Sequence, residues 1–348
     1  MNRNLPDSVP PAAVIIPVHN DARWLGKCLD AVVPVARERG WELVVVDDAS
    51  RDRSPAIAEE RNVRVIRLPE NRGVSFSRNT GAAETTAPVL VFVDSDIVPV
   101  PGCLENLVRT LVTRADVHAV GAYPVPGDLS PDWSAHFVGL RSAWGYHWEQ
   151  GEDERPFSSI QSECGAIRRA VFDELDGFSE RHGGVGMEEF HMSHEMERKG
   201  YGHLLLRGAA YEHHYKKLMR RCRALVDRTA RWVPLVLQRK RFESRGAVGT
   251  PDAALSALLS LAGAGLLLSG FFFPPLWLGC LGAYCFQFIV ELPFLRFARS
   301  LYGWRMAAYA LAALQPYNLA IGLGFSRGLL RQLLMRIPRP EQPPSGRE

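Results

Sequence analysis

A run of 38 residues without Asp, Glu, Lys or Arg, Ala253–Val290, restricts the folding of this 348-residue chain more than any other feature. As a helix it would extend about 57 Å, enough for two crossings of a hydrocarbon core about 30 Å thick. Pro274–Pro275 would break such a helix near its middle, so we predict a hairpin with spans at Ala253–Phe273 and Leu276–Leu295. The length of the run and the charge beside it favour this hairpin over buried helices of a soluble domain.

A strongly basic segment precedes this run. Residues 216–245 contain eleven Lys or Arg and two acidic residues, a net charge of +9, whereas the whole chain has +3. Positive charge beside apolar spans is typical of the cytoplasmic side of a membrane protein. The first thirteen residues lack the apolar run of a signal peptide. We therefore expect a multi-pass protein of the cell (inner) membrane, with the bulk of the chain in the cytoplasm.

A third uncharged run, Met306–Ser326, is weakened as a span by Gln315, Pro316 and Asn318. A third crossing would also place the arginines that follow it on the side away from the basic segment. We expect this run to be re-entrant, interfacial or a weak span.

Between Ala12 and Tyr123, short apolar runs of strand length alternate with segments of helical periodicity. The apolar runs are Ala12–Val18, Leu43–Val46, Val63–Leu68, Val89–Val93 and Val117–Ala122. Apolar runs of this kind, with helices between them, are typical of a parallel sheet that helices cover on both faces. We therefore predict an α/β fold with a mostly parallel sheet, and ligands at the carboxyl ends of its strands.

Polar clusters stand at the ends of these predicted strands. They are Pro17-Val18-His19-Asn20, with Asn20 or Asp21 as the N-cap of a helix, Asp47-Asp48-Ala49-Ser50, Asn71–Gly81 with Arg78, and Asp94-Ser95-Asp96. Two carboxylates on a tight turn supply hard oxygen ligands for Mg²⁺ or Mn²⁺, which in turn hold a diphosphate. An acidic residue on a neighbouring strand can bind a ribose or a base, and an arginine near a helix start can bind phosphate. No GxGxxG or GxxxxGK[ST] motif follows a strand, which removes support for dinucleotide and P-loop sites.

In this order and spacing, PVHN, VVVDDAS, NRGVSFSRNTG and VFVDSDIVP resemble the family 2 glycosyltransferases, which have the GT-A fold. The resemblance continues through Cys164–Phe172, through Gly186–Met192, which is similar to the family's Glu-Asp motif, and to His213. It covers about residues 12–235. It implies metal-dependent, inverting transfer of a sugar from a nucleotide-diphosphate sugar to an acceptor hydroxyl or phosphate, with Mn²⁺ or Mg²⁺ as cofactor.

The resemblance also implies roles for individual residues. It assigns donor binding to Pro17, Asn20, Asp47, Asp48, Arg78, Asp94 and Ser95, metal binding to Asp96, Asp94 and His213, and the acceptor side to Cys164, Gly165, Ala166 and His191. Glu189 aligns with the Asp that acts as catalytic base in related enzymes. Because a Glu stands there instead, the choice of base between Glu189 and Glu188 is open.

The expected organisation is an N-terminal tail (1–11), a GT-A glycosyltransferase domain (12–235), a basic juxtamembrane linker (236–252), transmembrane or interfacial helices (253–326) and a basic, Pro-rich tail (327–348). An active site at the membrane suits a lipid-linked acceptor or a glycan. The alternatives are a non-catalytic, membrane-bound scaffold that binds sugar nucleotides, and a processive polysaccharide synthase. Arg231-Trp232 resembles part of the Q-x-x-R-W signature of such synthases, but Arg228 stands where Gln belongs. A nucleic-acid partner is the weakest option, because the adjacent spans explain the basic charge.

Overall fold

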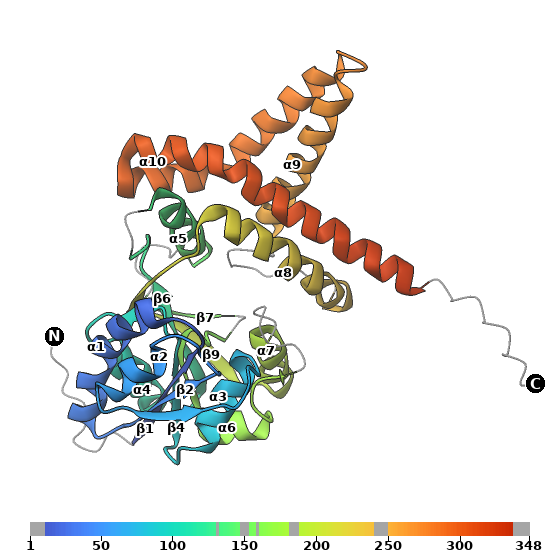
Figure 1. Ribbon diagram of the computed structural model, residues 1–348. Coiled ribbons are helices and arrows are strands. Elements are labelled where there is room, and N and C mark those ends of the chain that lie inside the picture. Colours follow the sequence, from blue (N-terminus) through green and yellow to red (C-terminus); the bar gives the residue numbers. More distant parts are fainter. Residues whose placement is uncertain are drawn as a thin grey trace, which may run out of the picture.

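The computed structural model describes residues 11–129, 132–146, 153–157, 160–180, 188–239 and 250–336 (Figure 1). Outside the described residues lie most of the predicted N-terminal tail, residues 240–249 of the basic linker, Gly186-Met187 and the Pro-rich end of the chain from residue 337.

The elements follow one another as β1 (Ala12–Val18), α1 (Ala22–Arg39), β2 (Glu42–Asp47), α2 (Ser54–Glu59), β3 (Arg64–Arg67), α3 (Val74–Ala83), β4 (Val89–Val93), β5 (Ile97–Pro99), α4 (Cys103–Thr113), β6 (Val117–Pro124), α5 (Trp133–Gly145), β7 (Glu154–Pro156), β8 (Cys164–Arg168), α6 (Arg169–Glu174), α7 (Glu188–Lys199), β9 (Gly202–His213), α8 (Leu218–Arg239), α9 (Pro251–Ser269) and α10 (Leu276–Arg336). All five apolar runs predicted as strands are strands.

The strands form one mixed sheet in the order β3-β2-β1-β4-β8-β6-β9-β5, with β7 paired to β9. β1 to β4 are parallel neighbours, as predicted, and β6 pairs parallel with β9. β8 lies antiparallel between β4 and β6, so the parallel order is interrupted once in the middle. Gly165 permits this insertion, because a Cβ there would lie 2.2 Å from the carbonyl oxygen of Gln161 and 2.8 Å from that of Val120.

Helices cover both faces of the sheet, and each face has its own apolar core. Val14 and Ile16 of β1 point into the cluster that contains residues of α1 and α4. Ile15, between them, points into the opposite cluster, which contains residues of α3, α6 and α7. Because side chains alternate along a strand, both faces must be apolar, which explains the continuous apolar runs in the sequence.

The C-terminal helices stand apart from the sheet. α9 and the first part of α10 form an antiparallel hairpin (Figure 1), and the turn between them contains the predicted break at Pro274–Pro275. Gly303, with φ 75° and ψ −176°, interrupts α10. The remainder of α10 carries the third uncharged run and packs against α5 and α8, with residues such as Leu314 and Tyr317 buried there.

Within the described residues, α9 and α10 are long and apolar enough to cross a membrane, with a mean hydropathy of 1.6 in their most apolar windows. Only 28% of each window is buried against other parts of the protein. The turn of the hairpin exposes apolar side chains, including Phe272, which is 93% exposed.

Several polar side chains inside the helical region are paired across helices. Gln287 Nε2 donates to Ser260 Oγ at 2.8 Å, and Gln315 Nε2 donates to Gln287 Oε1 at 3.1 Å. Asn318 Nδ2 donates to Glu291 Oε1 at 3.0 Å. The same carboxylate oxygen lies 3.6 Å from an amino group of Arg141, on α5. Such pairing is what an apolar environment requires of polar groups.

Candidate functional site

Predicted site residues from several strands gather at one edge of the sheet. β1, β2, β4, β6 and β9 run in the same direction, so their carboxyl ends share that edge. Asn20, Asp48, Asp94 and His213 lie at or directly after these ends. β6 leads towards α5 and β9 towards α8, so the edge faces the helices that pack against α10 (Figure 1).

Arg78 of α3 bridges two acidic residues at this edge. Its side chain is almost fully buried, with one amino group 2.6 Å from Asp94 Oδ1 and the other 3.5 Å from Glu188 Oε1. Burial raises the pKa of Asp94 to about 6, although the guanidinium of Arg78 opposes the rise. The sequence predicted that Arg78 binds donor phosphate, whereas here its guanidinium joins the turn after β4 to the start of α7.

Asp96 and His213 face one another because β5 pairs antiparallel with the end of β9. His213 Nε2 lies 3.3 Å from Asp96 Oδ1, and the N–H of His214 donates to the backbone carbonyl of Asp96 at 3.0 Å. Burial alone would lower the pKa of His213, but Asp96 and nearby carboxylates raise it to about 9. Burial would raise the pKa of Asp96, but His213 holds it below its usual value.

These two side chains offer part of a divalent metal site. A carboxylate and an imidazole side by side are a donor pair that Mn²⁺ accepts. His213 Nδ1 is buried and has no hydrogen-bond partner among the residues that the structure describes. Asp94 is occupied by Arg78, and the described parts of the chain contain no group of three or more His, Cys, Asp or Glu arranged for a metal. The residues therefore fit a metal that takes its other ligands from a bound diphosphate and water, after His213 loses its proton.

The structure distinguishes the two glutamates that begin α7. Glu188 is buried beside Arg78, whereas Glu189 accepts hydrogen bonds from Ser162, from Oγ at 2.6 Å and from the N–H at 3.2 Å. Burial raises the pKa of Glu189 to about 7, with Glu163 and Glu188 adding to the rise and Arg228 and Ser162 opposing it. A carboxylate with a pKa near neutrality can accept and release a proton at working pH.

Asp48 shapes the turn that precedes α3. Its side chain is 3% exposed, and its two oxygens accept the N–H groups of Arg72 at 2.7 Å and Gly73 at 2.8 Å. Gly73 has φ 89°, a conformation that glycine adopts without strain. The predicted nucleotide-binding carboxylate is thus occupied in holding two loops of the edge together.

The other predicted donor residues lie close to Asp48. Asn20, in the left-handed region with φ 54°, donates its N–H to Ser50 Oγ at 2.9 Å. Asp47 Oδ1 accepts the N–H of Ser50 at 3.0 Å. Pro17 is buried within β1, paired with Val46. These contacts bring the loops after β1 and β2 together, as the predicted donor site requires.

Three residues of this edge were not identified as site residues from the sequence. Asp21 precedes α1 as predicted for an N-cap, but its side chain makes no capping bond and instead accepts from Ser95 Oγ at 2.7 Å. Burial raises the pKa of Asp21 to about 6. Ser162 and Glu163 lie just before β8, and the N–H of Asp94 donates to the carbonyl of Glu163 at 2.8 Å. No motif in the sequence marks Ser162 or Glu163, since their positions depend on pairing between β4 and β8.

The predicted acceptor-side residues lie in two different places, in a buried strand and on an exposed helix surface. Cys164, Gly165 and Ala166 lie in β8 with their side chains or backbone buried in the sheet, and Cys164 Sγ is 3.9 Å from Cys103 Sγ. His191 is exposed on α7. β8 therefore reaches the site through the two residues that precede it rather than through Cys164.

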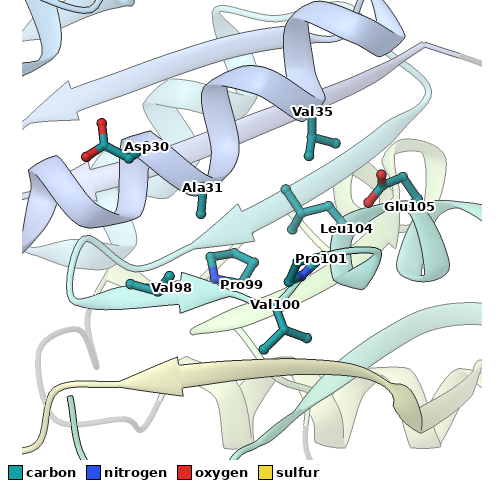
Figure 2. A pocket seen from close by; sticks show the side chains of 9 residues that line it. All are labelled: Asp30, Ala31, Val35, Val98, Pro99, Val100, Pro101, Leu104 and Glu105. Carbon is teal, nitrogen blue, oxygen red and sulfur yellow. The ribbon is translucent and has the colours of Figure 1, made fainter.

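A hollow of about 380 Å³ lies elsewhere, between α1, β5 and the start of α4 (Figure 2). Its walls are mostly apolar, from Val35, Pro99 and Leu104 among others, with Asp30 and Glu105 as its charged lining residues. None of the predicted site residues lines it, and it offers few polar groups to a sugar nucleotide.

Residues 13–176 match the model of the family described as Glycosyl transferase family 2. The chain is 34% identical over 110 residues to glycosyltransferase AglE of Haloferax volcanii, which covers 30% of this chain and 36% of that one. It is 30% identical over 156 residues to glucosyl-dolichyl phosphate glucuronosyltransferase of the same organism, covering 42% of this chain and 48% of that one. The match thus spans less than half the length of each of these relatives.

The fold is similar to that of mannosyltransferase PcManGT from Pyrobaculum calidifontis, solved in complex with GDP-Man and Mn²⁺. The TM-score is 0.52 at 20% identity, and the likeness covers 94% of this chain and 88% of that one. At this identity the comparison concerns the fold, a mixed α/β sheet followed by long apolar helices. Residues 13–176 are therefore similar to glycosyl transferase family 2, and the fold of the chain is of the GT-A type.

Proposed function

We propose that this protein transfers a sugar from a nucleotide-diphosphate sugar to a lipid-linked acceptor at the cytoplasmic face of the cell membrane. The proposal rests on one observation, that a candidate base and a candidate donor site lie at the same edge of the sheet. Glu189 is held by Ser162 at the same edge as Asp94 and Asp96, and Arg78 connects the two parts.

In the proposed reaction a hydroxyl of the acceptor attacks the anomeric carbon of the donor sugar. The bond between that carbon and the diphosphate oxygen breaks, and its electron pair leaves with the nucleoside diphosphate. Glu189 takes the proton of the attacking hydroxyl, whereas Glu188 is held in an ion pair with Arg78. A single displacement of this kind inverts the anomeric configuration.

Asp96 and His213 would hold the divalent cation, with Asp94 fixed nearby by its ion pair with Arg78. When bound, Mn²⁺ or Mg²⁺ would neutralise negative charge on the leaving diphosphate. The structure of PcManGT with GDP-Man and Mn²⁺ supports this choice of donor and metal class.

The position of the site supports a lipid-linked acceptor. The edge with Glu189 faces α5 and α8, which pack against the apolar helix α10 (Figure 1). One relative is a glucosyl-dolichyl phosphate glucuronosyltransferase, an enzyme whose name includes a lipid-linked substrate. We place the hairpin of α9 and α10 in the bilayer, the rest of α10 at its surface, and the transferase domain, residues 12–235, in the cytoplasm.

Nucleotide binding tests the proposal. We expect one of UDP, GDP, CDP and dTDP to bind the full chain in detergent only when Mn²⁺ or Mg²⁺ is present. Asp96→Ala should abolish this binding, and Glu189→Gln should keep it while turnover is lost. If no nucleotide shows metal-dependent binding, the proposed transferase activity is wrong.

A further inference from the structure

Helix α8 has sides with different neighbours. Its side with Thr229 and Val233 packs against α10, where a Cβ on Gly324 would lie 2.8 Å from Thr229 Cβ and a Cβ on Gly328 would lie 2.8 Å from Val233 Cβ. At 100° per residue, Arg221 and Arg228 share another side, about a third of a turn away. Both are half-buried.

The other arginines of α8 have a different environment. Arg220, Arg223 and Arg231 are exposed on the remaining side of the helix. Asp227 also lies there and pairs with Arg327 of α10. Arg220, Arg223 and Arg231 therefore form an ordinary exposed basic surface, whereas Arg221 and Arg228 are half-buried.

The side with Arg221 and Arg228 faces the candidate site. Arg221 interacts electrostatically with Tyr215, whose ring centroid is 4.3 Å from that of His213. Arg228 interacts electrostatically with Glu189. The two arginines thus act on different functional parts of the edge, Arg221 on the tyrosine next to the candidate metal ligand and Arg228 on the candidate base.

One nitrogen of Arg221 is left unsatisfied by the described part of the protein. Its Nε is buried and has no hydrogen-bond partner among those residues. A buried donor without a partner costs free energy that an anionic ligand would recover. The two arginines are seven positions apart, roughly 10 Å along the helix axis, a distance that two long side chains can close around one diphosphate.

We infer that Arg221 and Arg228 bind a diphosphate group of the acceptor and place the acceptor hydroxyl next to Glu189. The inference rests on the proposed function and specifies its acceptor, a molecule with a diphosphate close to its reactive hydroxyl. The neighbouring apolar helix α10 indicates that this diphosphate belongs to a lipid.

The test measures equilibrium binding of farnesyl diphosphate, inorganic pyrophosphate and farnesol to the full chain in a neutral detergent. EDTA is present throughout, so that no divalent metal recruits diphosphate to Asp96. We expect farnesyl diphosphate to bind, and Arg221→Gln and Arg228→Gln each to weaken it roughly tenfold or more. Arg220→Gln and Arg223→Gln remove the same charge from the exposed side of the same helix and should change binding less than twofold.

The three probes separate the possible sources of affinity. Tighter binding of farnesyl diphosphate than of pyrophosphate supports a lipid diphosphate, and equal binding supports the diphosphate site without a lipid contribution. The inference is overturned if farnesol binds as well as farnesyl diphosphate, or if all four variants lose affinity equally, as a general basic surface would. It is also overturned if neither Arg221→Gln nor Arg228→Gln weakens the binding of farnesyl diphosphate.

Metal-dependent nucleotide binding, measured on the same variants, separates this inference from the proposed function. Normal nucleotide binding by Arg221→Gln and Arg228→Gln shows that the variants fold. If nucleotide binding fails in the unmodified chain, the proposed function is wrong; if it persists while the arginine variants bind farnesyl diphosphate normally, only the acceptor inference is wrong.

Discussion

The pH dependence of turnover tests the assignment of Glu189 as the catalytic base. Because burial and the neighbouring carboxylates raise its pKa to about 7, about half of the molecules hold the base form at pH 7 and about one in eleven at pH 6. Turnover at saturating substrate should therefore be level above neutrality and fall about tenfold per unit well below it.

Two substitutions should shift the pH at which turnover falls, the acid limb of the pH profile, in opposite directions. Ser162→Ala removes a hydrogen bond to the ionised carboxylate, which is worth about 1.5 kcal/mol or more, so the limb should move up by about one pH unit. Glu163→Gln removes a negative charge that raises the pKa of Glu189, so the limb should move down.

The assay is the initial rate of nucleoside diphosphate release between pH 5 and pH 9. Glu174→Gln is a control, because Glu174 lies on α6, bonded to Lys199 and Tyr201, and does not contribute to the pKa of Glu189. The reasoning is refuted if Ser162→Ala and Glu163→Gln shift the limb in the same direction, or if Glu189→Gln retains more than about a tenth of the activity.

Three further substitutions test how the protein is held together. Arg141→Met should leave Glu291 buried without its cationic partner and lower the free energy of unfolding by about 3–5 kcal/mol. The double variant Arg141→Met with Glu291→Leu should recover most of that loss, as measured by thermal unfolding of the full chain. Arg78→Met should abolish turnover and lower the melting temperature, since it leaves two carboxylates without their shared cation; unchanged kinetics would contradict the bridge. Gly81→Ala should cost about 1–3 kcal/mol because its Cβ would lie 2.4 Å from a side chain of β1, whereas Gly265→Ala, with open space around it, should cost nothing.

The sequence was sufficient to predict the elements whose pattern is local. The five apolar runs are strands because both faces of the sheet are buried, and the helical hairpin turns at Pro274–Pro275 as its length and prolines require. The gathering of Asn20, Asp48 and Asp94 at one edge follows from parallel strands, and the structure has it.

What the sequence could not show depends on contacts between distant segments. β8 is a run of five residues without a clear period, and its antiparallel place is set by pairing with β4 and β6. The partners of Arg78 lie 16 and 110 positions away, so an arginine near a helix start was interpreted as a phosphate ligand. Ser162 has no motif, and its hydroxyl reaches Glu189 only after β8 is in place.

Hydrogen bonds between polar side chains inside the helical region fix the positions of its helices along their axes. Ser260 on α9, Gln287 on the first part of α10 and Gln315 on the second are bonded in series. A shift of any one helix by a turn, about 5.4 Å, would break its bond and leave an amide or hydroxyl without a partner in an apolar surrounding. The three segments therefore keep one axial register, so that a change in tilt must move them together. The contact between Arg141 and Glu291 links this movement to α5.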